Sequence, residues 1–500
     1  MVDNNYLDFG DLINYALELF KKRPNILKYY RQKFKYIMVD EFQDTNFAQF
    51  QLVKLLAGDD ERSSDTNPST RFARSGHNLT VVGDDDQSIY KFRGASVSNI
   101  LKFKQEYPDS KQITLTDNYR SKQNILDLAY KFIQANNPDR LEVKLKISKK
   151  LISSTGSEGI IQVLENQDLS GEMDSISKKI NEIKKAEPEA TYNDFAVLIR
   201  ANSAADELLP ILANNNIPYT FVANKGLYKK PIIVDLLAFI RLLDNSHDSI
   251  SLYRVFSLPK FHLTHQELSS LLEHSHKKTL SLFESLTPAL TLADISADGK
   301  NKIRELQSLL QKHSVLAKTH TAAEMLVMII KDLELEQKLK DDTLETSQNR
   351  ELVDQFYKKI ENFEKQNAHK DLHSFLLSLD LEIQAGSEGE IRFDPNSGPE
   401  SVKVLTVHSA KGLEFKYVFI INLVEQRFPT RARGETIEIP GALVKDILPE
   451  GDFHLQEERR LFYVAITRAK LGLYLTWAKD YGGKALKKPS QFLAETGLVP

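Results

Sequence analysis

One short stretch decides the fold class: residues 36–44 read YIMVDEFQD, an apolar run that stops at two adjacent carboxylates. Tyr36–Val39 has the length and character of a buried strand. In open α/β sheets, ligands bind beyond the carboxyl ends of the strands. Asp40 could hold Mg²⁺ there, and Glu41 could orient or deprotonate a water molecule. A solvated acidic loop that follows a strand remains an equal alternative on these two residues alone.

The same alternation of strands and helices continues outward from this stretch. Residues 1–35 have apolar residues at helical spacing, and further helices are predicted at 49–57, 97–106 and 123–135. Strands are predicted at Leu79–Val82, Ile113–Leu115, Ile160–Leu164, Phe195–Arg200, Val402–Val407, Tyr417–Leu423 and Leu471–Trp477. This order favours parallel, doubly wound α/β sheets. Between about residues 245 and 385, leucine-rich helical periodicity predicts an all-helical insertion.

Composition excludes several classes of protein. The 500 residues include 41% hydrophobic and 27% charged residues and no cysteine, which is typical of globular domains without disulfides or thiolate zinc sites. The longest apolar run, Tyr417–Leu423, is far shorter than the ~20 residues of a membrane helix. The polar N-terminus does not resemble a signal peptide, so we expect a cytoplasmic protein. A net charge of −3 means that any nucleic-acid binding relies on local contacts and stacking.

A second strand end carries acids, an amide and aromatic residues. Residues 82–94 read VGDDDQSIYKFRG. The neutral side chain of Gln87 could bond a γ-phosphate or an attacking water without repelling either. Tyr90 and Phe92 alternate with Lys91 and Arg93, a pattern that suits base stacking combined with phosphate contact. The alternative is a turn whose aromatic side chains pack in the core.

Two further turns could contact a nucleotide. In Asp117–Ser121, Tyr119 could stack on a purine and Arg120 could pair with phosphate oxygens; the alternative is an ordinary helix-entry segment with a surface arginine. In Leu405–Phe415, backbone amides, hydroxyls and charges follow a strand. That turn could bind phosphate or sugar hydroxyls, or it could be a strand-to-helix turn that needs Gly412 for backbone reasons.

A helix near the C-terminus places an arginine on its apolar face. Leu461, Val464, Ala465 and Arg468 recur at helical spacing. A buried guanidinium needs an acceptor. Either a carboxylate or a nucleotide phosphate, approached as by an arginine finger, could supply it.

Four histidines, His262, His265, His274 and His276, gather in the helical block. Metal binding is not expected, because they fall on different helix faces. Thr264 and Glu267 instead have the spacing of a helix capping box.

The order of these motifs resembles that of a known family. The segments DEFQDTN (40–46), VVGDDDQSIYKFRGA (81–95), NYRS (118–121), TVHSAKGLEF (406–415) and EERRLFYVAITRAK (457–470) resemble motifs II to VI of superfamily 1 DNA helicases of the UvrD, PcrA and Rep type. The resemblance implies two RecA-like P-loop NTPase motor domains with an inserted helical subdomain. It places part of the first motor domain at residues 1–113, the second at 114–245 and 396–500, and the insertion at 246–395.

The resemblance also implies roles for individual residues. It assigns ATP and Mg²⁺ as cofactors, with Asp40 serving Mg²⁺, Glu41 as the catalytic base and Gln87 as the γ-phosphate sensor. It places Tyr119 on the adenine, Arg120 on the γ-phosphate, Glu414 and Gly412 near the ribose, and Arg468 as the arginine finger. It assigns Tyr90, Phe92, Arg93 and His408 to DNA or to its coupling with ATP. The family usually has tryptophan where this chain has Phe92, so weaker stacking is expected there.

The sequence contains no GxxxxGKS or GxxxxGKT loop, which cradles phosphates in such motors. We therefore expect an N-terminally truncated 3′–5′ DNA helicase of repair or replication restart whose isolated chain is weak or inactive. Its expected partners are single-stranded DNA and single-strand/duplex junctions, with a complementary N-terminal fragment or repair proteins as further candidates and no membrane. The alternative is a non-catalytic remnant that binds single-stranded DNA or protein, or half of a split helicase.

Overall fold

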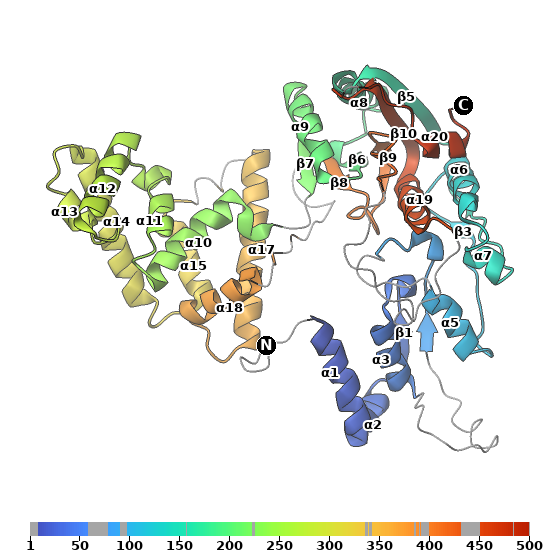
Figure 1. Cartoon of the computed structure of the whole chain (residues 1–500), viewed down its shortest axis with the longest axis horizontal. Helices are drawn as coiled ribbons and strands as arrows, with labels where there is room; N and C mark the ends of the chain where they lie inside the picture. Colours follow the sequence, from blue (N-terminus) through green and yellow to red (C-terminus); the bar gives the residue numbers. More distant parts are fainter. Residues whose placement is uncertain are drawn as a thin grey trace. The chain divides into compact units, whose positions relative to one another are not determined.

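The computed structural model describes residues 9–58, 79–90, 98–156, 158–222, 226–335, 339, 343–384, 387–389, 391, 400–431, 451–483 and 485–499. The chain forms two compact units (Figure 1). The first comprises Met1–Phe221 and Ser401–Pro500, and the second comprises Val222–Glu400. The first unit contains every residue to which the sequence assigns a role in catalysis or binding.

The N-terminal part of the first unit is built on two short parallel strands. Its elements are α1 (Phe9–Lys22), α2 (Pro24–Lys33), β1 (Ile37–Val39), α3 (Phe47–Ala57), β2 (Leu79–Val81) and α5 (Ser98–Glu106). Val39 pairs with Val81, so both strands end at the same edge. Phe42, just beyond β1, is fully buried and packs edge-on against Phe50 and Phe103. This aromatic cluster anchors the segment that carries the first pair of carboxylates.

The predicted strand at Ile113–Leu115 is wrong. These residues are irregular, and the side chains of Ile113 and Leu115 are 69% and 77% exposed. A strand needs a partner for its backbone groups, and none of the described residues pairs with this run. A short parallel pair forms instead just downstream, between β3 (Asp117–Asn118) and β4 (Ile152–Ser153).

The C-terminal part of the first unit contains a six-stranded sheet in the order β5-β10-β9-β6-β8-β7. Its strands are β5 (Ile160–Asp168), β6 (Phe195–Ile199), β7 (Tyr219–Val222), β8 (Val402–Thr406), β9 (Phe415–Ile420) and β10 (Ala469–Asp480). β10 pairs in parallel with β5 and β9, and β6 pairs in parallel with β8 and β9. All five residues of β6 are buried, as expected for a strand covered on both faces. Since β7 and β8 flank the helical unit in sequence, this sheet is continuous across the insertion.

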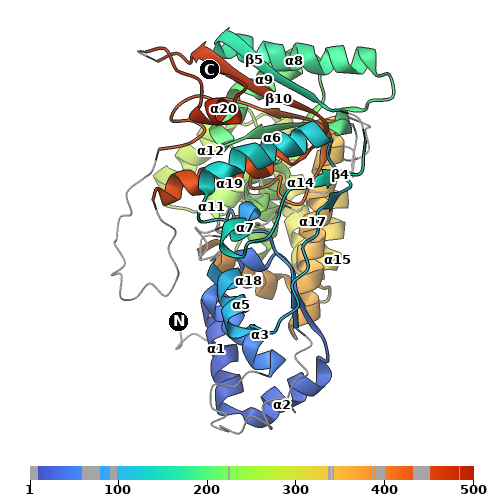
Figure 2. The same cartoon turned by 90° about the vertical axis from the view of Figure 1, so that its right-hand side faces the viewer.

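Helices cover both faces of this sheet, namely α6 (Gln123–Ile133), α8 (Leu169–Ala186), α9 (Ala205–Asn214), α19 (Phe453–Ile466) and α20 (Gln491–Thr496). The short helix α7 (Leu141–Lys144) follows α6 in the chain. On one face, α8 lies along β5 and β10, and it shares a buried core with α9 (Figure 1, Figure 2). On the other face, α6, α19 and α20 meet through the rings of Phe132, Phe462 and Phe492. The result is a parallel α/β layer with helices on both faces.

The second unit is helical. It contains α10 (Pro231–Asp244), α11 (Ser249–Val255), α12 (His265–Lys278), α13 (Leu286–Ala289), α14 (Ala297–Leu316), α15 (Ala322–Asp332), α17 (Leu344–Gln366) and α18 (Leu372–Gln384). Its core surrounds α10, whose Leu236, Phe239 and Ile240 are fully buried. Across the described part of residues 226–391 there are helices and no strands, in agreement with the leucine-rich periodicity. The predicted boundaries at residues 246 and 395 lie inside this unit. None of the helices in the described ranges is long and apolar enough to cross a membrane.

Candidate active site

The first pair of carboxylates lies directly beyond β1. Asp40 and Glu41 are both exposed, and Asp40 Oδ1 accepts the Glu41 backbone N–H at 2.8 Å. Glu41 has φ +48°, a left-handed conformation that L-residues rarely adopt and that costs about 1 kcal/mol or more. This bend ends the strand and starts the short helical turn Phe42–Asp44.

Gln43 links this bend to the end of β2. Its Nε2 donates to Glu41 Oε2 at 2.5 Å, and its Oε1 accepts the Asp84 backbone N–H at 3.0 Å. Gln43 is fully buried. A Cβ at Gly83 would lie 2.6 Å from Gln43 Oε1, so glycine is needed for this close approach. Our sequence reasoning gave Gln43 no role, because the contact joins residues 41 positions apart.

Lys411 joins three of the sequence motifs. Its Nζ lies 3.1 Å from Glu41 Oε2, forms an ion pair with Asp44, and donates to the Gln87 main-chain oxygen at 2.8 Å. The Lys411 side chain is only 7% exposed. Burial raises the pKa of Asp44, although the Lys411 ammonium partly offsets this effect. Lys411 and Asp44 lie inside the quoted motifs, but the residue pattern alone did not single them out.

Tyr90 packs against the same turn. Its hydroxyl donates to the His408 main-chain oxygen at 3.2 Å, and the two rings lie 6.2 Å apart. Lys411 Nζ lies 5.4 Å from the centre of the Tyr90 ring, within cation–π range. The structure therefore brings Tyr90 and His408 together. Phe92 and Arg93, also assigned to DNA, lie outside the described residues.

Arg120 and Glu414 form a second contact between motifs. Arg120 Nε donates to Glu414 Oε2 at 2.6 Å, and Lys470 Nζ lies 2.6 Å from Glu414 Oε1. These two cations, Lys470 first, lower the pKa of Glu414. Tyr119 is 78% exposed, which leaves its ring accessible for stacking. Gly412 has φ +85° and open space around its Cα, so glycine serves the backbone of this turn.

Arg468 follows α19 and is only 2% exposed. Its guanidinium donates to the main-chain oxygens of Val464 at 3.0 Å and Leu413 at 3.1 Å, and to the Thr467 hydroxyl at 3.1 Å. No carboxylate among the described residues pairs with it. Burial, reinforced by the charge of Arg120, lowers its pKa to about 10. Within the described part of the chain, neutral oxygens rather than a carboxylate accept from this buried guanidinium.

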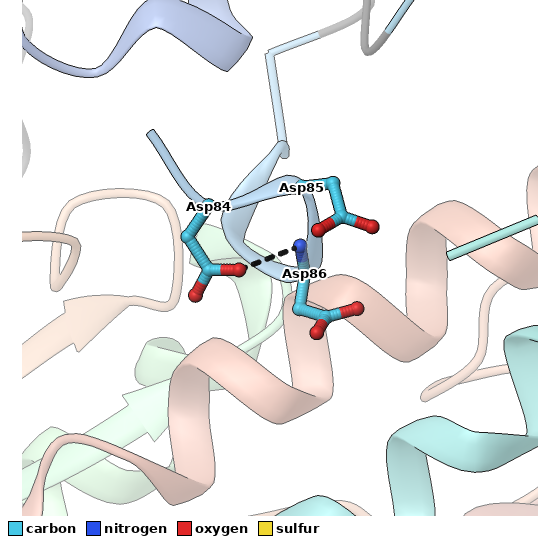
Figure 3. Close-up of side chains that lie close together, drawn as sticks. All are labelled: Asp84, Asp85 and Asp86. Atoms are coloured by element: carbon cyan, nitrogen blue, oxygen red, sulfur yellow. Dashed lines mark hydrogen bonds between the residues drawn. The ribbon is translucent and has the colours of Figure 1, made fainter. Parts of the chain in front are cut away.

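Three successive carboxylates, Asp84 to Asp86, lie on the turn that follows β2 (Figure 3). Asp84 accepts the backbone N–H of Asp86 at 3.2 Å, and Asp84 Oδ2 accepts the side-chain amide of Gln87 at 2.8 Å. Lys149 Nζ pairs with all three carboxylates. Arg140 donates to both oxygens of Asp86, at 2.8 and 2.7 Å. Because cations already pair with the three acids, the cluster is an ion-pair network rather than a metal centre.

The residues present fit a magnesium–nucleotide complex. A buried guanidinium without a carboxylate partner is costly unless an anion approaches it, and Arg468 has this arrangement. Asp40 offers an exposed carboxylate at a strand end, where hard cations bind through oxygen ligands. Direct contacts join Glu41 to Lys411, Gln87 to Lys411, and Arg120 to Glu414. Of the predicted site residues that the structure describes, Asp40 forms a hydrogen bond only with Glu41. No contact joins Arg468 to Gln87 in the described part of the chain.

The sequence matches two family descriptions in succession. Residues 1–108 match the UvrD/REP helicase N-terminal domain, and residues 113–480 match the UvrD-like helicase C-terminal domain. The chain is 34% identical over 499 residues to an "ATP-dependent DNA helicase PcrA" of Staphylococcus aureus (strain MRSA252), covering 98% of this chain and 62% of that relative. A protein of the same name from Staphylococcus epidermidis is 33% identical over 499 residues. The chain thus spans about 62% of the length of the relatives it matches. It belongs to the UvrD-like helicase family.

Proposed function

We propose that this chain is the larger part of an ATP-dependent DNA helicase that moves 3′ to 5′ along single-stranded DNA. The relatives that it resembles are named ATP-dependent DNA helicases. DNA repair or replication restart, in the cytoplasm, is the process that fits such a motor. Single-stranded DNA and single-strand/duplex junctions are the proposed substrates.

One observation carries this proposal: the buried Lys411 ammonium connects the strand end after β1, the turn after β2 and the turn after β8. It contacts Glu41 and the Gln87 main chain directly. The adjacent Tyr90 ring packs against His408. In a motor, nucleotide chemistry and DNA contact must respond to each other. A single cation that touches the proposed base, the proposed phosphate sensor and an aromatic DNA contact provides a physical connection for that response.

The proposed chemistry assigns one task to each group. Asp40 would hold Mg²⁺, and a bound ATP would supply the phosphoryl bond whose hydrolysis drives movement. Glu41 orients and deprotonates the attacking water, and Gln87 hydrogen-bonds the reacting phosphate without adding charge. Arg468 and Arg120 stabilise the negative charge that develops on the phosphate oxygens. Tyr119 stacks on the adenine, while Gly412 and Glu414 line the ribose side.

Contact with DNA is proposed for a neighbouring group of side chains. Tyr90 and Phe92 would stack on bases, and Arg93 would pair with the DNA backbone. His408 would transmit the presence of DNA to the turn that holds Lys411. The isolated chain should turn over ATP weakly, because its 500 residues contain no GxxxxGKS or GxxxxGKT loop.

Strand displacement tests this function. The chain as given, and the same chain preceded by a segment that carries a phosphate loop, are mixed with duplexes that have a 3′ or a 5′ single-stranded tail. We expect ATP-dependent unwinding of the 3′-tailed duplex by the extended protein, and little unwinding by the chain alone. Preference for the 5′ tail would contradict the polarity. Strong unwinding by the chain alone would contradict its proposed weakness.

A further inference from the structure

The acidic turn Asp84–Asp86 is held by residues from far along the chain. Arg140 and Lys149 lie near α7, more than 50 positions downstream of the acids that they bind. Asp85 and Asp86 are 0% and 1% exposed, and Arg140 is 1% exposed. Burial of this depth is costly for charges unless each has a well-placed partner. The turn therefore depends on these two cations for its charge balance.

Each of the three carboxylates in the acidic turn has a cationic partner. Lys149 Nζ lies 2.6 Å from both Asp85 Oδ1 and Asp86 Oδ2, and it also pairs with Asp84. Burial opposes ionisation of Asp86, but the Lys149 and Arg140 charges outweigh it, so its pKa is lowered. Burial and the neighbouring acids raise the pKa of Asp85. Without Lys149, three adjacent carboxylates would face each other with one cation fewer.

The Asp84 carboxylate divides its two oxygens between different partners. Oδ1 receives Lys149 Nζ and the Asp86 backbone N–H. Oδ2 receives the side-chain amide of Gln87 at 2.8 Å. Lys149 thus fixes the rotation of the carboxylate that orients the Gln87 amide. At the other end of the same residue, the Gln87 main-chain oxygen is held by Lys411 at 2.8 Å.

Glu142 forms hydrogen bonds to both Arg140 and Lys149. It accepts from Arg140 Nη1 at 2.6 Å, from the Lys149 backbone N–H at 3.1 Å and from the Tyr130 hydroxyl at 2.7 Å. Both cations are therefore held in place by contacts within their own segment. Such preorganised support allows them to set the position of the turn rather than to follow it.

We propose that Lys149 and Arg140 are positioning residues for Gln87: together they clamp the acidic turn and fix the Asp84 carboxylate that orients the Gln87 amide. This inference rests on the proposed function, in which Gln87 faces the reacting phosphate. Misplacement of a catalytic group by about 1 Å can cost roughly 100-fold in rate. Loss of the clamp should therefore reduce turnover more than it reduces substrate binding.

The test combines kinetics with hydrogen exchange. ATP turnover is measured at saturating single-stranded DNA for the chain preceded by a phosphate-loop segment, with Lys149→Met, Lys149→Arg and Lys150→Met. Lys150 is the matched control, since its side chain is 59% exposed and lies 3.8 Å from Asp127. We expect Lys149→Met to lower kcat roughly tenfold or more while the KM for ATP stays within about twofold. Lys149→Arg should restore most of kcat, and Lys150→Met should match the parent protein.

Hydrogen exchange on the chain as given separates this inference from the proposed function. The Gln87 and Ser88 amides donate to the main-chain oxygens of Asp84 and Asp85 at 3.0 and 3.2 Å. They should exchange faster in Lys149→Met than in Lys149→Arg or Lys150→Met. Unchanged exchange, or a fall in kcat that Lys149→Arg does not rescue, would overturn the inference. A parent protein without DNA-stimulated turnover would instead refute the proposed function, while the exchange comparison still decides the role of the clamp.

Discussion

At the scale of single residues, the surroundings of Arg468 differ from those of an arginine held in an ion pair. Its charge is buried, and its three partners are neutral oxygens. A structural arginine in such a position normally pairs with an acid, as Arg200 does with Glu458 at 2.5 Å. Desolvation without a carboxylate partner makes Arg468 a poor contributor to stability but a strong ligand for an anion.

Replacing Arg468 should therefore separate stability from activity. In Arg468→Met, the loss of three hydrogen bonds and the relief of desolvation oppose each other, so the free energy of unfolding should change by no more than about 1 kcal/mol. ATP turnover of the phosphate-loop-extended protein should fall by roughly 1000-fold, as when an arginine finger is lost. Thermal unfolding and ATP hydrolysis measure the two effects.

The matched control is Arg200→Met, which leaves Glu458 buried at 3% exposure without its cation. It should cost about 2–4 kcal/mol in stability and leave the turnover of the folded protein near that of the parent. If Arg468→Met unfolded the protein while Arg200→Met did not, Arg468 would be a structural residue.

Sequence reasoning identified residues of the candidate site but not the contacts between them. Helical spacing predicted that Arg468 is buried, and it is, but the residue lies just beyond the end of α19 rather than on the helix. Spacing could not identify Lys411, Gln43 or Lys149 as residues that connect the motifs. Lys411 binds a partner 367 positions away in the sequence, and Gln43 binds one 41 positions away. Such pairings depend on how strand ends converge, which local pattern does not encode. The roles of the individual site residues remain predictions.

At the scale of elements, the start of α12 shows how a predicted local motif becomes part of a larger junction. Thr264 and Glu267 form the expected capping box. Glu267 also accepts the Ser296 hydroxyl at 2.6 Å and its backbone N–H at 3.1 Å, at the start of α14. A Cβ at Gly299 would lie 2.5 Å from Glu267 Oε1, which explains the glycine there.

This junction predicts an acid-sensitive contribution to stability. Burial opposes ionisation of Glu267, but its hydrogen bonds outweigh that effect and lower its pKa from 4.5 to about 2. A lowered folded-state pKa means that the stabilisation is fully present above pH 4.5 and is lost as the pH falls toward 2. The lowered pKa corresponds to roughly 3 kcal/mol of stabilisation at neutral pH.

Urea unfolding followed by far-UV circular dichroism, at about pH 6 and about pH 3.5, measures this effect. Glu267→Gln should be less stable than the parent at the higher pH, and the gap should narrow by about 1 kcal/mol at the lower pH. Glu273→Gln, an exposed glutamate of the same helix paired with Lys277, is the control. Trp477, the only tryptophan, lies in β10 and reports the other unit by fluorescence. A gap that does not change with pH would contradict the prediction.

Predictions of elements succeeded where apolar runs were long and buried. β6, β9 and β10 were predicted from such runs and form the centre of the sheet. The strand predicted at Ile113–Leu115 does not form. A run of only three residues, with apolar residues at alternate positions, cannot show whether a neighbouring strand is available to pair with it. The helical unit was predicted from periodicity over many turns, a much stronger signal than a three-residue run.

At the scale of the whole molecule, the predicted fold class is confirmed. Parallel sheets and a helical unit occur in the predicted order, and the family matches cover residues 1–108 and 113–480. The motifs that carry the resemblance all lie in the first compact unit, while the helical unit carries none of the residues assigned to ATP. Local sequence patterns thus predicted the order of strands and helices along the chain. The prediction of DNA-dependent ATP hydrolysis came from the family resemblance.

The most direct test of the central claim is ATP hydrolysis with and without single-stranded DNA. It compares the chain as given, the chain preceded by a phosphate-loop segment, and the extended chain with Glu41→Gln. We predict DNA-stimulated turnover in the extended chain only, with turnover falling to background in Glu41→Gln because the proposed base is lost. Helicase-like turnover by the chain alone, or full turnover in Glu41→Gln, would contradict the account.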